Sequence, residues 1–138
     1  MVKVCNDLSN NNIEVPILLK GSKNKIANEL FESAFKAQWD SMLNDIKKFP
    51  QHAMLLNSAA WLGAMCDHDL TKCLEMAQKS VKIDEGAANL DTLAEVHFRL
   101  KNFKEAVKYI EKAASMEKTE PFFKDRVKKF KKAAEEAK

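Results

Sequence analysis

Two cysteines and a histidine near the middle of the chain are the residues best suited to metal or redox chemistry. Cys66, His68 and Cys73 lie beside Asp67 and Asp69, and thiolate, imidazole and carboxylate are all zinc ligands. Zinc sites usually take ligands two to four residues apart from two separate places in the sequence, and this chain has no second cluster. A thiol or metal sensor is therefore the weakest function considered, and we expect no metal and no cofactor.

Catalysis would require a nucleophile with its base, or a pair of carboxylates, in a pocket. The histidines are His52, His68 and His97, and no catalytic motif surrounds any of them. The sequence has no glycine-rich phosphate loop and no dinucleotide fingerprint, and 3 glycines could hardly build one. Cys5 lies in a polar stretch with no neighbour that would lower its pKa. We expect no catalytic residues and interpret the chain as a non-enzyme.

The composition predicts one helical domain. The 138 residues are 46% hydrophobic and 31% charged, with 3 glycines and 3 prolines, so residues that break helices are rare. No apolar stretch approaches the roughly 20 residues that cross a bilayer, and the run from Val15 to Leu19 is too short for a signal peptide. An odd number of cysteines without close pairs fits reduced thiols. We expect a cytoplasmic protein, or an exported one if the chain is a fragment of a larger protein.

The segment from Leu56 to Glu117 contains an internal repeat. Its first copy reads LNSAAWLG and then KCLEMAQKSVKID, and its second reads LDTLAEVHF and then EAVKYIEKAASME. Ala60 corresponds to Ala94, a step of 34, whereas the later pairs have a step of 33: Cys73 and Ala106, Ser80 and Ala113, Ile83 and Met116. The first copy therefore has one extra residue in its loop. A period of this length with two helical patterns per unit is typical of a helical solenoid.

Apolar residues spaced three and four apart predict six or seven helices and no strand. The first stripe runs from Asn24 to Phe49, and either one long helix or two helices meeting near Lys36 would produce it. Asp69 and Asn102 are expected to cap helices. Residues 1–22 are expected to be irregular. The later helices are expected over about 52–66, 70–83, 90–100 and 103–116, with a last one from residue 121.

The repeat resembles the tetratricopeptide repeat (TPR) family. The second unit carries the family's pattern at Leu90, Leu93, Ala94, Phe103, Ala106 and Ala113, and the first unit carries a looser form at Ala60, Leu70, Cys73 and Ser80. Gly63 departs from the pattern, because the family prefers an aromatic residue there. The resemblance covers about residues 39–121. It implies an all-α, right-handed α-solenoid of antiparallel helix pairs over 23–138, with units at about 53–86 and 87–120 and a capping helix at 121–138.

The resemblance also implies a function, which is to hold a protein or peptide in a concave groove lined by the first helix of each unit. The two carboxylates in this groove would repel the C-terminal carboxylate that chaperone-binding members hold, so we expect a basic or neutral peptide. The apolar residues of the first unit would either contact a partner or pack against the N-terminal segment or a preceding helix. The expected groove residues are Met54, Asn57, Trp61, Met65, Asp91, Glu95, Phe98 and Arg99.

The C-terminal end carries the positive charge of the chain. Residues 101–138 hold 12 basic and 7 acidic side chains, whereas residues 1–100 hold 11 and 13. We favour a capping helix that docks through Phe123, Val127 and Phe130 and presents lysines to water. The alternative is a basic adaptor that contacts nucleic acid or an acidic membrane surface through residues 118–138. A homo-oligomer is also compatible with the sequence.

Overall fold

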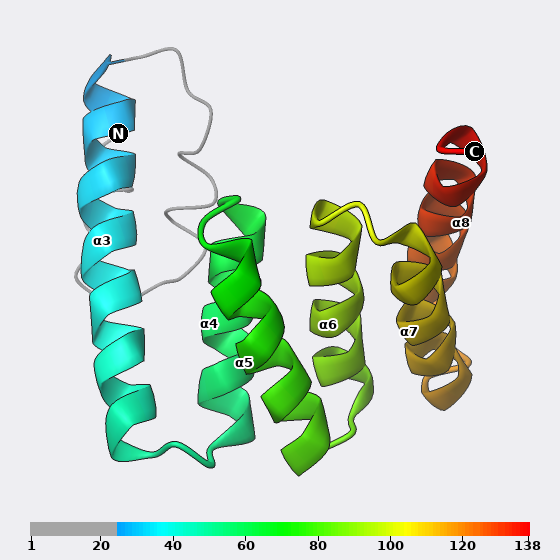
Figure 1. Cartoon of the computed structure of the whole chain (residues 1–138), viewed down its shortest axis with the longest axis horizontal. Helices are drawn as coiled ribbons and strands as arrows, with labels where there is room; N and C mark the ends of the chain where they lie inside the picture. The colour runs from blue at the N-terminus through cyan, green and yellow to red at the C-terminus, as the bar shows by residue number, and fades with distance from the viewer. Residues whose placement is uncertain (1–24) are drawn as a thin grey trace.

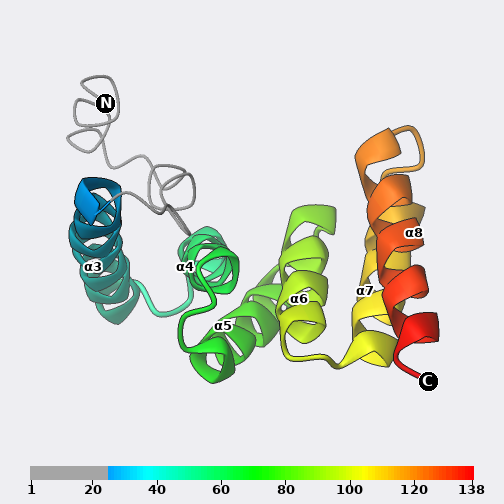
Figure 2. The same ribbon diagram turned by 90° about the horizontal axis from the view of Figure 1, so that it is seen from above.

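The computed structural model describes residues 25–138, which form six α-helices and no strand (Figure 1). Consecutive helices run in opposite directions, so the expected all-α solenoid of antiparallel helix pairs is confirmed (Figures 1 and 2). The segment expected to be irregular, residues 1–22 with Cys5, lies outside the described residues. The helices are α3 (Lys25–Lys48), α4 (Ala53–Met65), α5 (Leu70–Ile83), α6 (Ala87–Arg99), α7 (Phe103–Met116) and α8 (Pro121–Glu136).

α3 is one continuous helix of 24 residues, which decides between the two alternatives for this segment. It buries Phe35 and Trp39 and packs against α4. Lys47 and Lys48 occupy its last turn, where cations interact favourably with the negative end of the helix dipole. Phe49 and then Pro50 follow, and Pro50 cannot continue a helix, so the chain turns into α4.

The helix starts use different caps. The Asp69 carboxylate accepts a hydrogen bond from the Lys72 N–H at 3.3 Å, as the sequence predicts. Asn102 stands at the N-cap position of α7, as expected. The expected capping by its side chain is wrong, because that side chain makes no capping hydrogen bond. His52 caps α4 through Nδ1, which accepts from the Leu55 N–H at 3.4 Å. Pro121 opens α8, where its missing donor costs little.

The two turns inside the helix pairs have the same backbone geometry. Asp67 and Lys101 stand at equivalent positions of the two units, and both adopt the left-handed region, with φ of 51° and 62°. The N–H after each of them donates to a carbonyl five positions earlier, at 2.8 Å in both turns, which is a Schellman motif. Asp67 is followed by His68 and then by the cap Asp69, whereas Lys101 is followed directly by Asn102. The extra residue of the first loop is therefore His68.

Small residues stand where the helices of each pair approach most closely. Ala60, Ala94, Ala106 and Ala113 are all completely buried, as are Cys73 and Ser80 in the equivalent slots of α5. The Ser80 hydroxyl donates to the Ala53 carbonyl at 2.9 Å and so ties the end of α5 to the start of α4. These contacts allow helix axes to lie about 8–10 Å apart, with larger side chains filling the grooves.

The structure explains why Gly63 replaces the aromatic residue of the family pattern. A Cβ atom at Gly63 would collide with the Cys73 Sγ and would lie 2.9 Å from the Trp39 ring. Trp39 of α3 therefore occupies the space that an aromatic side chain on α4 would need. The large ring at this contact comes from α3 and not from α4.

α8 covers the open end of the second helix pair. Phe130 is completely buried in a core cluster with Ile110 of α7, and Phe123 and Val127 pack against the same cluster. The Phe130 ring stacks on Phe98 of α6, with centroids 4.5 Å apart. Docking of this helix through its three apolar residues is thus the arrangement that the spacing predicts.

Candidate partner-binding site

Four side chains share one face of α4 because they are spaced three and four residues apart. Met54 is 69% exposed, and Asn57, Trp61 and Met65 are half-buried. Trp61 and Met65 point toward the neighbouring helices: the Trp61 ring lies 5.9 Å from the Arg126 guanidinium, and the Met65 sulfur lies 3.9 Å from Arg99 Nη2. We call the surface formed here by α4, α6 and α8 the α4–α6–α8 face.

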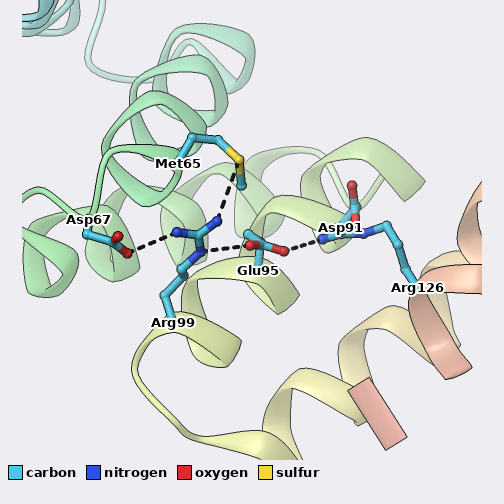
Figure 3. Close-up of polar contacts among 6 residues, drawn as sticks. All are labelled: Met65, Asp67, Asp91, Glu95, Arg99 and Arg126. Atoms are coloured by element: carbon cyan, nitrogen blue, oxygen red, sulfur yellow. Dashed lines mark hydrogen bonds and ion pairs between the residues drawn. The ribbon is translucent and has the colours of Figure 1, made fainter. Parts of the chain in front are cut away.

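The carboxylates of α6 are buried and paired with arginine. Arg126 of α8 donates to Asp91 at 2.5 Å and to Glu95 at 2.7 Å. Arg99 donates to the other oxygen of Glu95 at 2.9 Å and to Asp67 at 3.0 Å. Figure 3 shows these groups as one continuous chain across the face, from the turn after α4 to α8. We call it the arginine network.

The arginine network shifts the pKa values of its members in different directions. Burial raises the pKa of Asp91, and contact with Arg126 offsets this only in part. Burial would also raise the pKa of Glu95, but hydrogen bonds and positive charge from Arg99 and Arg126 outweigh it, so that pKa is lowered. The pKa of Arg99 rises despite burial, because Glu95 and Asp67 stabilise its charge. Glu95 is thus the central anion of the network.

Arg126 is a key residue of this face that sequence reasoning missed. No role follows for Arg126 from the sequence, yet its side chain is only 12% exposed and binds two carboxylates. Its guanidinium also lies over the Phe130 ring, 4.9 Å from the centroid. A signal was present, because Arg99 and Arg126 are the only arginines in a lysine-rich chain. Arginine binds buried carboxylates better than lysine does, since its planar fork donates to two oxygens at once.

Three of the expected groove residues do not have free side chains. Asp91 and Glu95 are 7% and 1% exposed and bind arginine. The Phe98 ring contacts the rings of Phe103 and Phe130 and packs against the core cluster that contains Phe130. The expectation that they line an open groove is corrected here, because α8 folds over them. The structure keeps the residues of α4 at the surface and places Arg99 at the edge, with its side chain 26% exposed.

The cysteine and histidine cluster has a packing role. The Cys73 thiol is buried and donates to the His68 carbonyl at 3.3 Å, and burial, with the nearby Asp69 charge, raises its pKa to about 12. Such a thiol is a poor nucleophile and a poor metal ligand at neutral pH. The His68 ring contacts the rings of Phe35 and Trp39. Across residues 25–138, no group of three or more metal-ligating side chains is arranged to hold an ion.

His97 is buried in the interface between α6 and α7. Its ring stacks on Tyr109 with centroids 5.5 Å apart, and its Nδ1 has no hydrogen-bond partner within the described part of the chain. Burial lowers its pKa, the Glu105 charge opposes this, and the Lys108 charge adds to the lowering. His97 therefore acts as an aromatic spacer between two helices, in a setting that disfavours protonation of its ring.

Comparisons with known proteins agree with this fold. A scan against models of protein families finds no match, and no curated protein matches the sequence. Among solved structures, the chain is similar to a thermophilic TPR protein from Thermus thermophilus, with a TM-score of 0.68 and 12% sequence identity. The match covers 87% of this chain and 64% of that chain. The likeness shows a TPR-like helical-repeat fold, as the residues predicted.

None of the helices in residues 25–138 is apolar enough over a sufficient length to span a membrane. α8 is amphipathic, but its apolar side is inside the fold through Phe123, Val127 and Phe130. The lysines of α8 remain at the surface, and Lys131 pairs with Glu111 of α7 at 2.6 Å. The alternative function, a basic adaptor, would therefore rest on the surface lysines of α8 alone, because the apolar residues of this helix pack inside the fold.

Proposed function

We propose that the chain is a protein-interaction module that binds a partner peptide along the α4–α6–α8 face, with no chemistry of its own. A TPR-like fold supports a scaffold role. The observation that carries the proposal is the row of Met54, Asn57, Trp61 and Met65 on α4. These side chains stay wholly or partly exposed. The neighbouring carboxylates of α6, in contrast, are buried and paired with arginine. Methionine and tryptophan suit adaptable apolar contacts with a peptide.

The ligand that fits this face is a basic or neutral peptide with apolar anchors. Both arginines already hold carboxylates, so neither is free to bind the C-terminal carboxylate of a ligand.

Peptide selection followed by affinity measurement tests this proposal. Peptides are selected from a random library on the immobilised full chain, and their dissociation constants are measured by isothermal titration calorimetry. Trp61→Ala should weaken binding about ten-fold or more, because it removes a large anchor. Met54→Ala should weaken it less, since Met54 lies at the end of the row.

Met116→Ala is the matched control. Met116 is also an exposed methionine, but it lies at the end of α7, away from the α4 row. It should leave the affinity unchanged. Circular dichroism checks that each variant stays folded. Equal affinities for wild type, Trp61→Ala and Met54→Ala would contradict binding along the α4–α6–α8 face.

A further inference from the structure

A cleft of about 820 Å³ lies between the start of α7 and the end of α8. Phe103 and Val107 of α7 and Ala134 of α8 form an apolar part of its lining, and the lysines around it include Lys101 and Lys104. The cleft does not include any of the four α4 side chains on which the proposed function depends. It is a second surface that requires its own explanation.

Within residues 25–138, the lining of the cleft has more unpaired lysines than unpaired glutamates. Lys101, Lys104 and Lys138 form no ion pair with any residue of 25–138, whereas Lys131 is held by Glu111. Two glutamates also line the cleft. Glu105 pairs with Lys108 at 3.4 Å, and Glu135 has no such pair in the same part of the chain. Unpaired positive charge is therefore in excess.

The internal repeat shows what fills an equivalent groove. One unit earlier, α7 packs on α6, and its Tyr109 also packs against the core cluster to which α5 contributes. Tyr109 of α7 stacks on His97 of α6, and Leu74 of α5 packs against the same core cluster as Tyr109. In the repeat, Leu74 corresponds to Val107, which lines the cleft. The cleft between α7 and α8 thus continues an established helix–helix interface, without a covering helix among the described residues.

Two carboxylates of the first unit that pair with later helices correspond to lysines in the second unit. Glu85 pairs with Lys112 of α7, and the residue equivalent to Glu85 in the second unit is Lys118. Asp67 pairs with Arg99 of α6, and the residue equivalent to Asp67 is Lys101, which lines the cleft. Neither Lys118 nor Lys101 has an ion-pair partner within residues 25–138. At both positions the first unit offers a carboxylate to the next helices, and the second unit offers a lysine.

We propose that the cleft between α7 and α8 is a docking site for an acidic amphipathic helix of a partner protein. The helix packs on α7 and α8 as α7 packs on α5 and α6. Ala134 lets its backbone approach closely, and an apolar or aromatic side chain takes the place that Tyr109 has one unit earlier. A carboxylate three residues after that anchor, at the position of Lys112, reaches toward Lys118. This interaction uses a different surface from the proposed function and does not depend on it.

A peptide made from α7 itself provides the probe. It has the sequence of residues 103–116 with Lys104, Lys108 and Lys112 replaced by glutamate, and it carries a fluorophore. The control peptide has the unchanged sequence. Binding to the full chain is followed by fluorescence anisotropy at low salt. The charge-reversed peptide should bind saturably, about ten-fold or more tightly than the unchanged peptide.

Two pairs of substitutions with the same change of charge locate the site. Lys101→Glu with Lys118→Glu should weaken binding of the charge-reversed peptide about ten-fold. Lys47→Glu with Lys48→Glu, at the exposed end of α3, should change it little. Trp61→Ala should also leave it unchanged, which separates this site from the α4–α6–α8 face. Thermal melts check the fold of each variant.

Four results would overturn the proposal. One is the absence of saturable binding up to about 1 mM, a concentration at which even a weak site is half filled. Others are equal affinity for the two peptides, or equal losses in the two lysine pairs, which would mean general charge attraction. The last is a concentration-dependent dimer that Lys101→Glu with Lys118→Glu abolishes, because the occupant would then be a second copy of the chain.

Discussion

At the scale of single residues, Arg126 joins α8 to the rest of the fold. Its guanidinium binds both carboxylates of α6, one of which is 1% exposed, and its own side chain is 12% exposed. Asp91 and Glu95 can carry negative charge while buried, because Arg126 binds both carboxylates and Arg99 binds Glu95. A buried ion pair contributes little compared with apolar residues of the same shape, but removing one partner leaves an uncompensated charge.

Arg126→Met should therefore lower the free energy of unfolding by about 3 kcal/mol. The substitution keeps an unbranched apolar stem but leaves Asp91 without an arginine and Glu95 with one. Urea unfolding at neutral pH measures the change. Arg99→Met is the control and should cost less, because Arg99 is 26% exposed and Glu95 keeps Arg126. Equal losses in the two variants would contradict the central place of Arg126.

His97 should make the stability depend on pH. Its folded pKa is lowered from the ordinary value of 6.5, so the unfolded chain takes up a proton first as the pH falls. The contribution of His97 to stability is complete above about pH 6.5 and is lost as the pH falls through the lower, folded pKa. Unfolding curves at pH 7.5 and 5.5 should show this loss. His97→Phe, which keeps the stack on Tyr109, should reduce the difference, and an undiminished difference would refute this role.

The resemblance to the TPR family suggested four residues of α4 for the proposed site. The structure places Met54, Asn57, Trp61 and Met65 on one face of α4, and their role in binding stays a prediction. The sequence could not show that Arg126 reaches across to the carboxylates of α6. That contact depends on how α8 is oriented against α6, which no local pattern contains.

At the scale of helices, α3 supplies a large side chain at its contact with α4, and α4 supplies a glycine there. Gly63 leaves space for the Trp39 ring and the Cys73 thiol. The departure of Gly63 from the family pattern was visible in the sequence, but its reason was not. The reason lies in a ring that enters from a helix outside the two clear repeat units.

Gly63→Ala should destabilise the chain by about 1–3 kcal/mol through overpacking. The new methyl group meets the Cys73 thiol first, so the cost should be smaller when Cys73→Ala is already present. Chemical denaturation of the two single variants and the double variant measures this coupling. Strictly additive losses would mean that the collision with Cys73 does not determine the cost.

Two phenylalanines of α8 allow a matched test of its docking. Phe130 is completely buried, whereas Phe122 is 54% exposed. Phe130→Ala should cost about 3–5 kcal/mol, because it leaves a cavity beside Phe98 and Ile110. Phe122→Ala should cost less than about 0.5 kcal/mol, as is usual at the surface. Thermal unfolding followed by circular dichroism measures both, and similar losses would contradict the packing of α8 described above.

The helices themselves were largely predictable. Their stripes, the cap at Asp69 and the start at Pro121 depend on residues close in sequence, and all appear in the structure. The Asn102 side chain, which makes no capping hydrogen bond, shows the limit of that reasoning. Residue type can favour a cap, but the hydrogen bond also requires a backbone and rotamer that bring the groups together.

At the scale of the whole molecule, the solenoid presents two different surfaces. The α4–α6–α8 face combines apolar side chains of α4 with an internally neutralised arginine network. The cleft between α7 and α8 combines an apolar floor with unpaired lysines. The repeat predicted the order and direction of the helices, because each unit packs on the next in the same way. It did not predict the charge reversal that distinguishes the last unit.

Hydrogen–deuterium exchange tests the proposed function most directly. The full chain is compared alone and with a saturating peptide selected on it, and amide protection is mapped along residues 25–138. We predict that protection increases most in α4, at residues 53–65, with little change in α5, at residues 70–83. Protection confined to α5 or α7, with none in α4, would contradict binding along the α4–α6–α8 face.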